Sequence, residues 1–205
     1  MNRGFERRVF PVKEFRVDKR DSGETVLAGY SAVFDSPSEN LGWGETELRE
    51  YILPGAFGEA LKSSDCRALF NHDPNFVLGR ESAGTLKITE DERGLFSEIT
   101  LPETSIARDL GVSVSRGDIK EQSFCFVVDK DEWEEDRKNK RIVRRIHTIR
   151  ELIDVSPVTY PAYPDTDIAK RSYDRFLASE KEKRGTARRL CHFERRYKFY
   201  RSMKG

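Results

Sequence analysis

Two residues of the chain, Ser123 and His72, could together perform nucleophilic chemistry. Ser123 follows a turn at residues 116–118 and lies in the middle of residues 119–128, whose alternating pattern predicts a strand. One face of this strand carries two Phe and a Val and is the expected core side, so Ser123 belongs to the opposite face, among small and polar residues. Such a serine is either a half-exposed residue of a sheet or a nucleophile that the strand holds rigidly toward a base.

His72 could supply that base. It follows the apolar run 66–70, which predicts a short buried strand, and it precedes a turn at residues 73 and 74. The strand would fix its backbone and the turn would leave the ring accessible. An imidazole, with its ordinary pKa of about 6.5, can take a hydroxyl proton near neutral pH. The alternative is an ordinary histidine of a surface loop. The two residues can meet only if the first and second halves of the chain pair within one barrel.

The elements that must position these residues are mostly strands. Alternation bounded by turn residues predicts further strands within residues 1–19 and at residues 25–34, 46–53, 84–88, 95–101 and 141–153. A charge run around Trp133 predicts the exposed tip of a hairpin at residues 129–140. Residues 56–62 predict a short helix, and Thr104 is the expected N-cap of a second helix that leads into the turn before Ser123.

The charge of the chain divides it into a body and a tail. The 205 residues carry a net charge of +1, but residues 170–205 hold 13 Lys and Arg against 4 Asp and Glu, a net charge of +9. The preceding residues therefore carry −8. The tail also has the spacing of an amphipathic helix, broken by Gly185, and too few apolar residues for a core of its own. We expect a catalytic body at residues 1–165 and a basic helical tail at residues 166–205, an appendage or a self-cleaved segment.

The three cysteines, Cys66, Cys125 and Cys191, are widely spaced and form no zinc or CxxC pattern, which suggests reduced thiols. No apolar run approaches the length that spans a membrane, and the first residues lack the apolar core of a signal peptide. We expect a soluble protein made in the cytoplasm. No metal cluster or phosphate-binding glycine loop is visible in the sequence, so no cofactor is implied.

Several motifs occur together in a specific order. They are LAGYSAVFDS at residues 27–36, PGAF at 54–57, LFNHD at 69–73, LGR at 78–80, GTL at 84–86, the segment from Asp109 to the turn at Arg116 and Gly117, SFCF at 123–126 and ELIDVSPVTYPAYP at 151–164. This ordered set resembles the prohead (capsid maturation) proteases of tailed phages over roughly residues 25–165. The resemblance implies a fold similar to the assemblin proteases of herpesviruses, which is mainly β with flanking helices in a closed, mainly antiparallel β-barrel.

The resemblance also implies a set of site residues. Ser123 matches the family's serine nucleophile in its Ser-Phe-x-Phe strand, and His72 matches the histidine base of the Asn-His-Asp turn. The third, orienting group corresponds to the acidic position of the Leu-x-acid-Val-Ser strand, which is Asp154 here. Cys125 stands where a small residue, often glycine, is usual.

Two other residues compete with Asp154 for the third role. His147 would make the two-histidine site that assemblins use, but three nearby arginines would disfavour its protonated form. Glu151 lies at an odd offset of three from Asp154, which places it on the opposite face of a strand. A carboxylate at Asp154 could accept the imidazole Nδ1–H and stabilise the imidazolium that forms during attack, so we favour Asp154.

Together these features predict a serine endopeptidase without a cofactor. By resemblance, it would cleave the scaffold or the scaffolding segment of the major capsid protein, and itself, inside the immature prohead in the host cytoplasm. The expected partners are the capsid protein and further copies of the chain, with no membrane. One alternative is a catalytically inactive, scaffold-binding assembly module. Another is a nucleic-acid-binding protein that uses the basic tail, although the acidic body argues against nucleic acid as the main partner.

Overall fold

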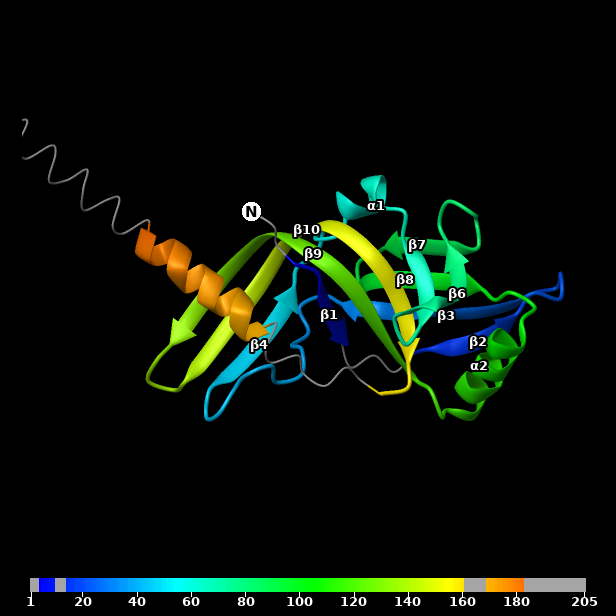
Figure 1. The fold of residues 1–205 in the computed structure, drawn as a ribbon, viewed down its shortest axis with the longest axis horizontal. Helices are drawn as coiled ribbons and strands as arrows, with labels where there is room; N and C mark the ends of the chain where they lie inside the picture. Colours follow the sequence, from blue (N-terminus) through cyan, green and yellow to red (C-terminus); the bar gives the residue numbers. More distant parts are fainter. Residues whose placement is uncertain (1–3, 10–13, 161–168, 183–205) are drawn as a thin grey trace, which may run out of the picture. The chain divides into compact units, whose positions relative to one another are not determined.

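The computed structural model describes residues 4–9, 14–160 and 169–182. The chain divides into two units, Met1–Thr166 and Asp167–Gly205. In the second unit the described residues, 169–182, form one helix, drawn in orange in Figure 1. The expected boundary at residues 165 and 166 and the basic stretch after Gly185 lie outside the described residues.

The first unit contains one sheet built around a long hairpin. The hairpin strands are β9 (Glu121–Asp136) and β10 (Arg141–Val158), the green and yellow arch of Figure 1. The strand order is β1-β9-β10-β5-β6, with β1 at Glu6–Val9, β5 at Arg67–Phe70 and β6 at Asp73–Arg80. A further strand, β4 (Glu47–Ile52), pairs in parallel with the start of β10, and β5 pairs in parallel with its end.

A second sheet has four antiparallel strands in the order β2-β3-β8-β7. They span Arg16–Lys19 (β2), Thr25–Val33 (β3), Gly94–Thr100 (β8) and Leu86–Glu90 (β7). Two helices join the strands in the described part of this unit, α1 (Ala60–Ser63) and α2 (Ser105–Arg116). The mainly β character therefore agrees with the sequence analysis.

The predicted closed barrel is wrong. Within the described residues the first sheet ends at β1 and β6 and the second at β2 and β7, and neither sheet closes on itself. One edge of β10 pairs with β9 and the other is divided between β4 and β5, while four register shifts bend the hairpin. Rows of inward-facing apolar residues look the same in a barrel and in two packed sheets, so alternation could not distinguish them.

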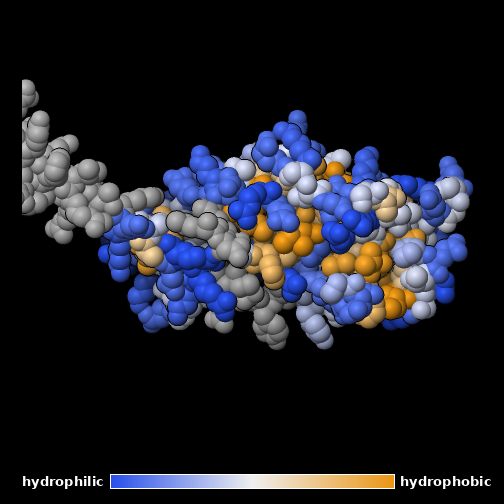
Figure 2. Space-filling model, turned by 45° about the horizontal axis from the view of Figure 1, so that its top comes forward, coloured by the Kyte–Doolittle hydropathy of each residue, from blue (hydrophilic) through white to orange (hydrophobic). Residues whose placement is uncertain are grey.

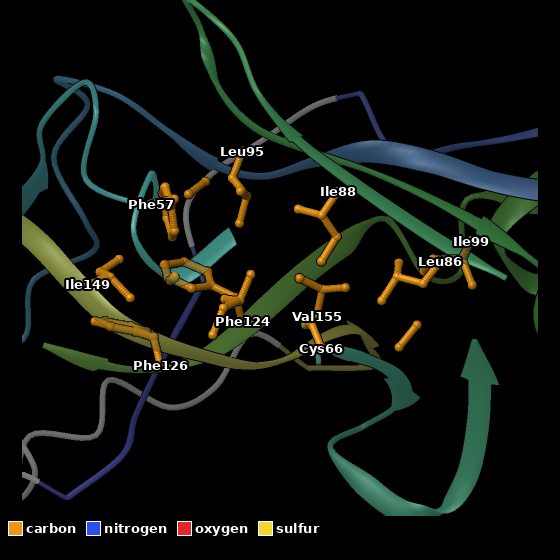
Figure 3. Packing of buried hydrophobic residues seen from close by; sticks show 14 of the residues in the cluster. Phe57, Cys66, Leu86, Ile88, Leu95, Ile99, Phe124, Phe126, Ile149 and Val155 are labelled. Carbon is orange, nitrogen blue, oxygen red and sulfur yellow. The ribbon is translucent and has the colours of Figure 1, made fainter. Parts of the chain in front are cut away.

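The core lies between the two sheets. Phe124 and Val155 point from the first sheet toward residues such as Leu95 and Ile88 of the second, and Phe126 stacks on Phe124 (Figure 3). The apolar face predicted for the strand around Ser123 is buried as expected, with Phe124 and Phe126 both 0 % exposed. This packing fixes the orientation of β9 and therefore the direction in which its opposite face points.

The helix before β9 ends in a way that delivers the chain to the strand. Thr104 caps α2, as predicted, by accepting a hydrogen bond from the Ala107 amide at 3.3 Å. Gly117 ends the helix in the left-handed conformation, with φ 81°. Beyond Ser123 the strand runs further than predicted, to Asp136, so the exposed tip of the hairpin is the turn at residues 137–140.

The face in Figure 2 is mostly hydrophilic, with apolar residues gathered in patches between charged ones. The large apolar side chains that are exposed are Phe5, Phe76, Val77, Ile106, Val112 and Tyr160. Among the described residues, no helix has the length and apolar character needed to span a membrane.

Candidate active site

Three side chains that are far apart in the sequence form one hydrogen-bonded chain. The Nε2 atom of His72 lies 2.7 Å from the Oγ atom of Ser123. On the other side of the ring, Nδ1 lies 2.6 Å from Oδ1 of Asp154. The structure thus brings together the serine, the histidine and the favoured acid, from β9, the β5–β6 turn and β10 respectively.

The turn that carries His72 has an unusual backbone. Asn71 and His72 both adopt left-handed conformations, with φ 54° and 58°, which non-glycine residues rarely do. The end of β10 holds this turn in place. The Asn71 amide donates to the Pro157 carbonyl at 3.0 Å, and the Asn71 side chain exchanges two hydrogen bonds with Thr159. The ring of His72 is therefore fixed relative to the strand that carries Asp154.

An irregularity in the β9–β10 ladder positions Asp154. Leu152 pairs with Phe126 and Asp154 pairs with Cys125, so two residues of β10 advance for one of β9. Such a bulge re-aims the side chains that follow it. After the bulge Asp154 is buried, whereas Glu151, the competing acid, is exposed.

A fourth residue, Ser156, contacts the site, and the sequence analysis missed it. Its hydroxyl donates to Oδ1 of Asp154 at 2.7 Å, the same oxygen that His72 binds, and Ser156 is fully buried. Ser156 is also the cross-strand partner of Ser123. The offset of two from Asp154 was the available signal, because strand residues two apart share a face.

His147 does not join this cluster. It lies in the half of β10 nearer the hairpin turn, away from Asp154. There its Nε2 atom is 3.4 Å from Oε2 of Glu132 on β9. This histidine is partly exposed, and it contacts a surface carboxylate rather than the buried site. The two-histidine arrangement is therefore absent from the described residues.

The site is more buried than the sequence suggested. Ser123 is 0 % exposed, and the side chains of His72 and Asp154 are 7 % and 5 % exposed, although we expected an accessible ring at the turn. The Ser123 hydroxyl also lies 3.1 Å from the carbonyl oxygen of Arg8 on β1. Strand β1 therefore contacts the serine directly.

The family model described as "Caudovirus prohead serine protease" matches residues 13–179. The chain belongs to this family. Its fold is similar to that of the capsid assembly protease gp21 of bacteriophage T4, with a TM-score of 0.50 at 9 % identity, over 75 % of this chain and 96 % of that chain. No curated protein matches the chain.

Two cysteines of this prohead protease, Cys66 and Cys125, have the properties of structural residues. Burial, and then the nearby carboxylate of Asp154, raise the pKa of Cys125 to about 12, and burial likewise raises the pKa of Cys66. Both thiols are free and buried, and they are protonated at neutral pH, which makes them poor nucleophiles and poor metal ligands. Within the described residues there is no group of three or more His, Cys, Asp or Glu that could hold a metal ion.

Proposed function

We propose that this prohead protease is a serine endopeptidase in which Ser123 is the nucleophile, His72 the general base and Asp154 the orienting acid. The observation that carries the proposal is the pair of hydrogen bonds, 2.7 and 2.6 Å long, that link the three side chains through the two nitrogens of one imidazole. In the family of serine proteases to which the chain belongs, this arrangement has a direct chemical use.

The mechanism follows from the two ends of the imidazole. With Nδ1–H donated to Asp154, Nε2 carries a lone pair and can accept the Ser123 proton as Oγ attacks a peptide carbonyl. The buried carboxylate of Asp154 then stabilises the imidazolium. The imidazolium returns its proton to the leaving amine, and water releases the acyl group by the same proton route. Ser156 donates to Asp154 and so holds the carboxylate in place.

The proposed substrates are the scaffold or the scaffolding segment of the major capsid protein, and the protease itself. The family description and the similarity of fold to a T4 capsid assembly protease support this class of substrate. The protease would then act inside the immature prohead in the host cell, without a cofactor. We further propose that residues 166–205 are an appendage, since their basic charge complements acidic scaffold or capsid surfaces.

The test is co-expression of the protease with the capsid gene of the same phage, followed by mass spectrometry of the fragments. The wild type should yield defined capsid and protease fragments. Folded Ser123→Ala and His72→Ala variants should yield none, because the members of such a unit each account for several orders of magnitude in rate. Normal processing by the folded Ser123→Ala variant would contradict the proposal and would favour another nucleophile, whereas a folded wild type that yields no fragments would favour an inactive assembly module.

A further inference from the structure

Strand β1 is a short strand beside the nucleophile. It pairs antiparallel with β9 over four residues, and Val9 is the partner of Ser123 (Figure 1). Within the described residues β9 is its one strand partner, so β1 forms the edge of the sheet. A four-residue strand that pairs with one neighbour at the edge of a sheet is among the elements that detach most readily.

The backbone of β1 competes for the proton of the nucleophile. A serine hydroxyl has one proton to donate, but Oγ of Ser123 lies within reach of two acceptors, Nε2 of His72 at 2.7 Å and the Arg8 carbonyl at 3.1 Å. If the proton points to Arg8, the contact with Nε2 requires a proton on the imidazole. An imidazole protonated at Nε2 cannot act as the base. The contact with β1 therefore opposes the arrangement that catalysis needs.

The side chains of β1 form half of a buried charge cluster. Arg8 binds Glu6 at 2.7 Å and also binds Glu50 of β4. Arg144 of β10 binds Glu6 at 2.8 Å and Glu50 at 2.7 Å, and it also contacts Asp131. All of these groups except Asp131 are at most 5 % exposed.

This cluster allows one strand to be exchanged for another. Removing β1 takes one positive charge, Arg8, and one negative charge, Glu6, out of the buried cluster. The pair that stays behind, Glu50 with Arg144, is still joined at 2.7 Å. Removing a single partner of a buried ion pair is costly because it leaves an isolated buried charge. Removing β1 leaves no such charge. An incoming strand with an acid and a base two residues apart would restore the full cluster.

We propose that the edge of β9 from Ser123 to Phe126 is the surface on which this protease binds its substrate as an added strand, and that β1 occupies it as an inhibitory strand. The inference rests on the proposed protease function. The occupant is an extended polypeptide segment, bound by main-chain hydrogen bonds as in other cases of strand addition. Its recognition element is a Glu-x-Arg spacing, with the arginine carbonyl next to Ser123. Because Ser123 is 0 % exposed while β1 is in place, the strand has to leave before a substrate can enter.

A disulfide can test whether β1 has to leave. Arg7 of β1 and Cys125 of β9 are directly opposite in the ladder, and Cys125 is a free thiol. Directly opposed residues of antiparallel strands lie within the Cα separation that a disulfide needs. Oxidised Arg7→Cys would therefore lock β1 onto β9, and mass spectrometry would verify the bond to Cys125. The matched control combines Arg7→Cys with Cys125→Ser, which changes β1 equally but cannot form this bond.

Binding is measured with a labelled peptide of residues 4–12, GFERRVFPV, on the Ser123→Ala background, so that cleavage plays no part. The reduced protein should bind the peptide, and the oxidised protein should bind it roughly 100-fold more weakly, since locking removes the competent state. The oxidant should have no effect on the control. A peptide with Lys in place of the glutamate should bind at least about tenfold more weakly to the reduced protein, because it places a second cation against Arg144.

Cleavage of the capsid substrate by the Arg7→Cys protein with Ser123 intact separates the two proposals. Slow cleavage when oxidised, restored by a reductant, supports the inhibitory strand. Equal cleavage in both states overturns it and leaves the protease function standing. Peptide binding that depends on the lock, without any cleavage when reduced, supports the strand surface but contradicts the protease function.

Deletion of residues 1–9 gives an independent test of the same surface. With the competing strand gone, a folded deletion variant should bind the peptide at least about tenfold more tightly than the full chain, because the fraction of protein with a free edge rises. Unchanged or weaker binding by the folded variant would contradict the inference. If the deletion prevents folding, the disulfide experiment decides alone.

Discussion

His72 and Ser156 bind the same oxygen atom, Oδ1 of Asp154, at 2.6 and 2.7 Å. The carboxylate is therefore held from two sides, by the ring that it orients and by a hydroxyl from its own strand. A shared oxygen of this kind makes the position of the imidazole depend on β10 as well as on the turn that carries His72.

The first prediction concerns the acid. Asp154→Asn should keep the fold and lower the cleavage rate by roughly 10²–10⁴-fold, because an amide cannot stabilise the imidazolium and sets the wrong tautomer. His147→Ala serves as the matched comparison and should change the rate little, since its contact is with Glu132 at the surface. Rates are measured on a capsid-derived peptide. A crippled His147→Ala enzyme beside a normal Asp154→Asn enzyme would contradict this assignment.

The second prediction concerns Ser156 as a positioning residue. Ser156→Ala removes one hydrogen bond to a charged group, which should lower kcat roughly tenfold and leave KM nearly unchanged. Ser156→Thr keeps the hydroxyl and should restore kcat. An unchanged kcat in Ser156→Ala would rule out this role.

The third prediction concerns the buried charge cluster and acid stability. Burial raises the pKa of Glu50, but the charges of Arg8 and Arg144 outweigh it and lower the pKa to about 2 from its usual 4.5. A pKa that is depressed in the folded state adds stability above pH 4.5, and this stability is lost as the pH falls toward 2.

Glu50→Gln should therefore lower the free energy of unfolding by about 3–5 kcal/mol at neutral pH, the loss that follows removal of one partner of a buried pair. The difference from wild type should shrink as the pH falls through this range. Urea unfolding at several pH values measures it. The control is Glu47→Gln on the same strand, where a partly exposed carboxylate binds Arg49 and its loss should matter little. An equal effect of the two substitutions would be evidence against the buried cluster as a source of stability.

The fourth prediction concerns the basic tail. A chain that ends after residue 182 keeps all of residues 13–179, which match the family, and loses nine Lys and Arg against one Glu. It should cleave a peptide at the wild-type rate but enter proheads poorly, because it has lost the charge that complements an acidic scaffold. Packaging is measured from the protease content of isolated proheads. Full packaging of the truncated chain would contradict the proposed targeting role.

The sequence was informative where a residue's role depends on its neighbours along the chain. Alternation placed Phe124 and Phe126 in the core, and residue preferences placed the cap at Thr104. The meeting of His72 with Asp154 was implied by family motifs, since 82 residues separate them and no local pattern encodes the contact.

The features that the sequence analysis missed depend on pairing between strands. Whether a sheet closes into a barrel depends on which edge strands pair with each other. The alternation of apolar and polar residues does not predict that pairing. The contact of Arg8 with Ser123 spans 115 residues and involves a backbone carbonyl, which every residue possesses. The role of Ser156 depends on the bulge between Leu152 and Asp154. The amino-acid composition of the strand does not predict where such a bulge lies.

Strand β10 is long, and it places the hairpin turn and the candidate active site near its opposite ends. Its first residue, Arg141, follows the exposed turn at residues 137–140, and Asp154 lies near its last. At about 3.3 Å a residue, the strand carries the acid up to roughly 45 Å from that turn along its path. A fluorophore or affinity tag inserted in the turn would therefore travel with the active site without touching it. Such a handle would allow the protease to be followed and recovered from assembling particles while it works.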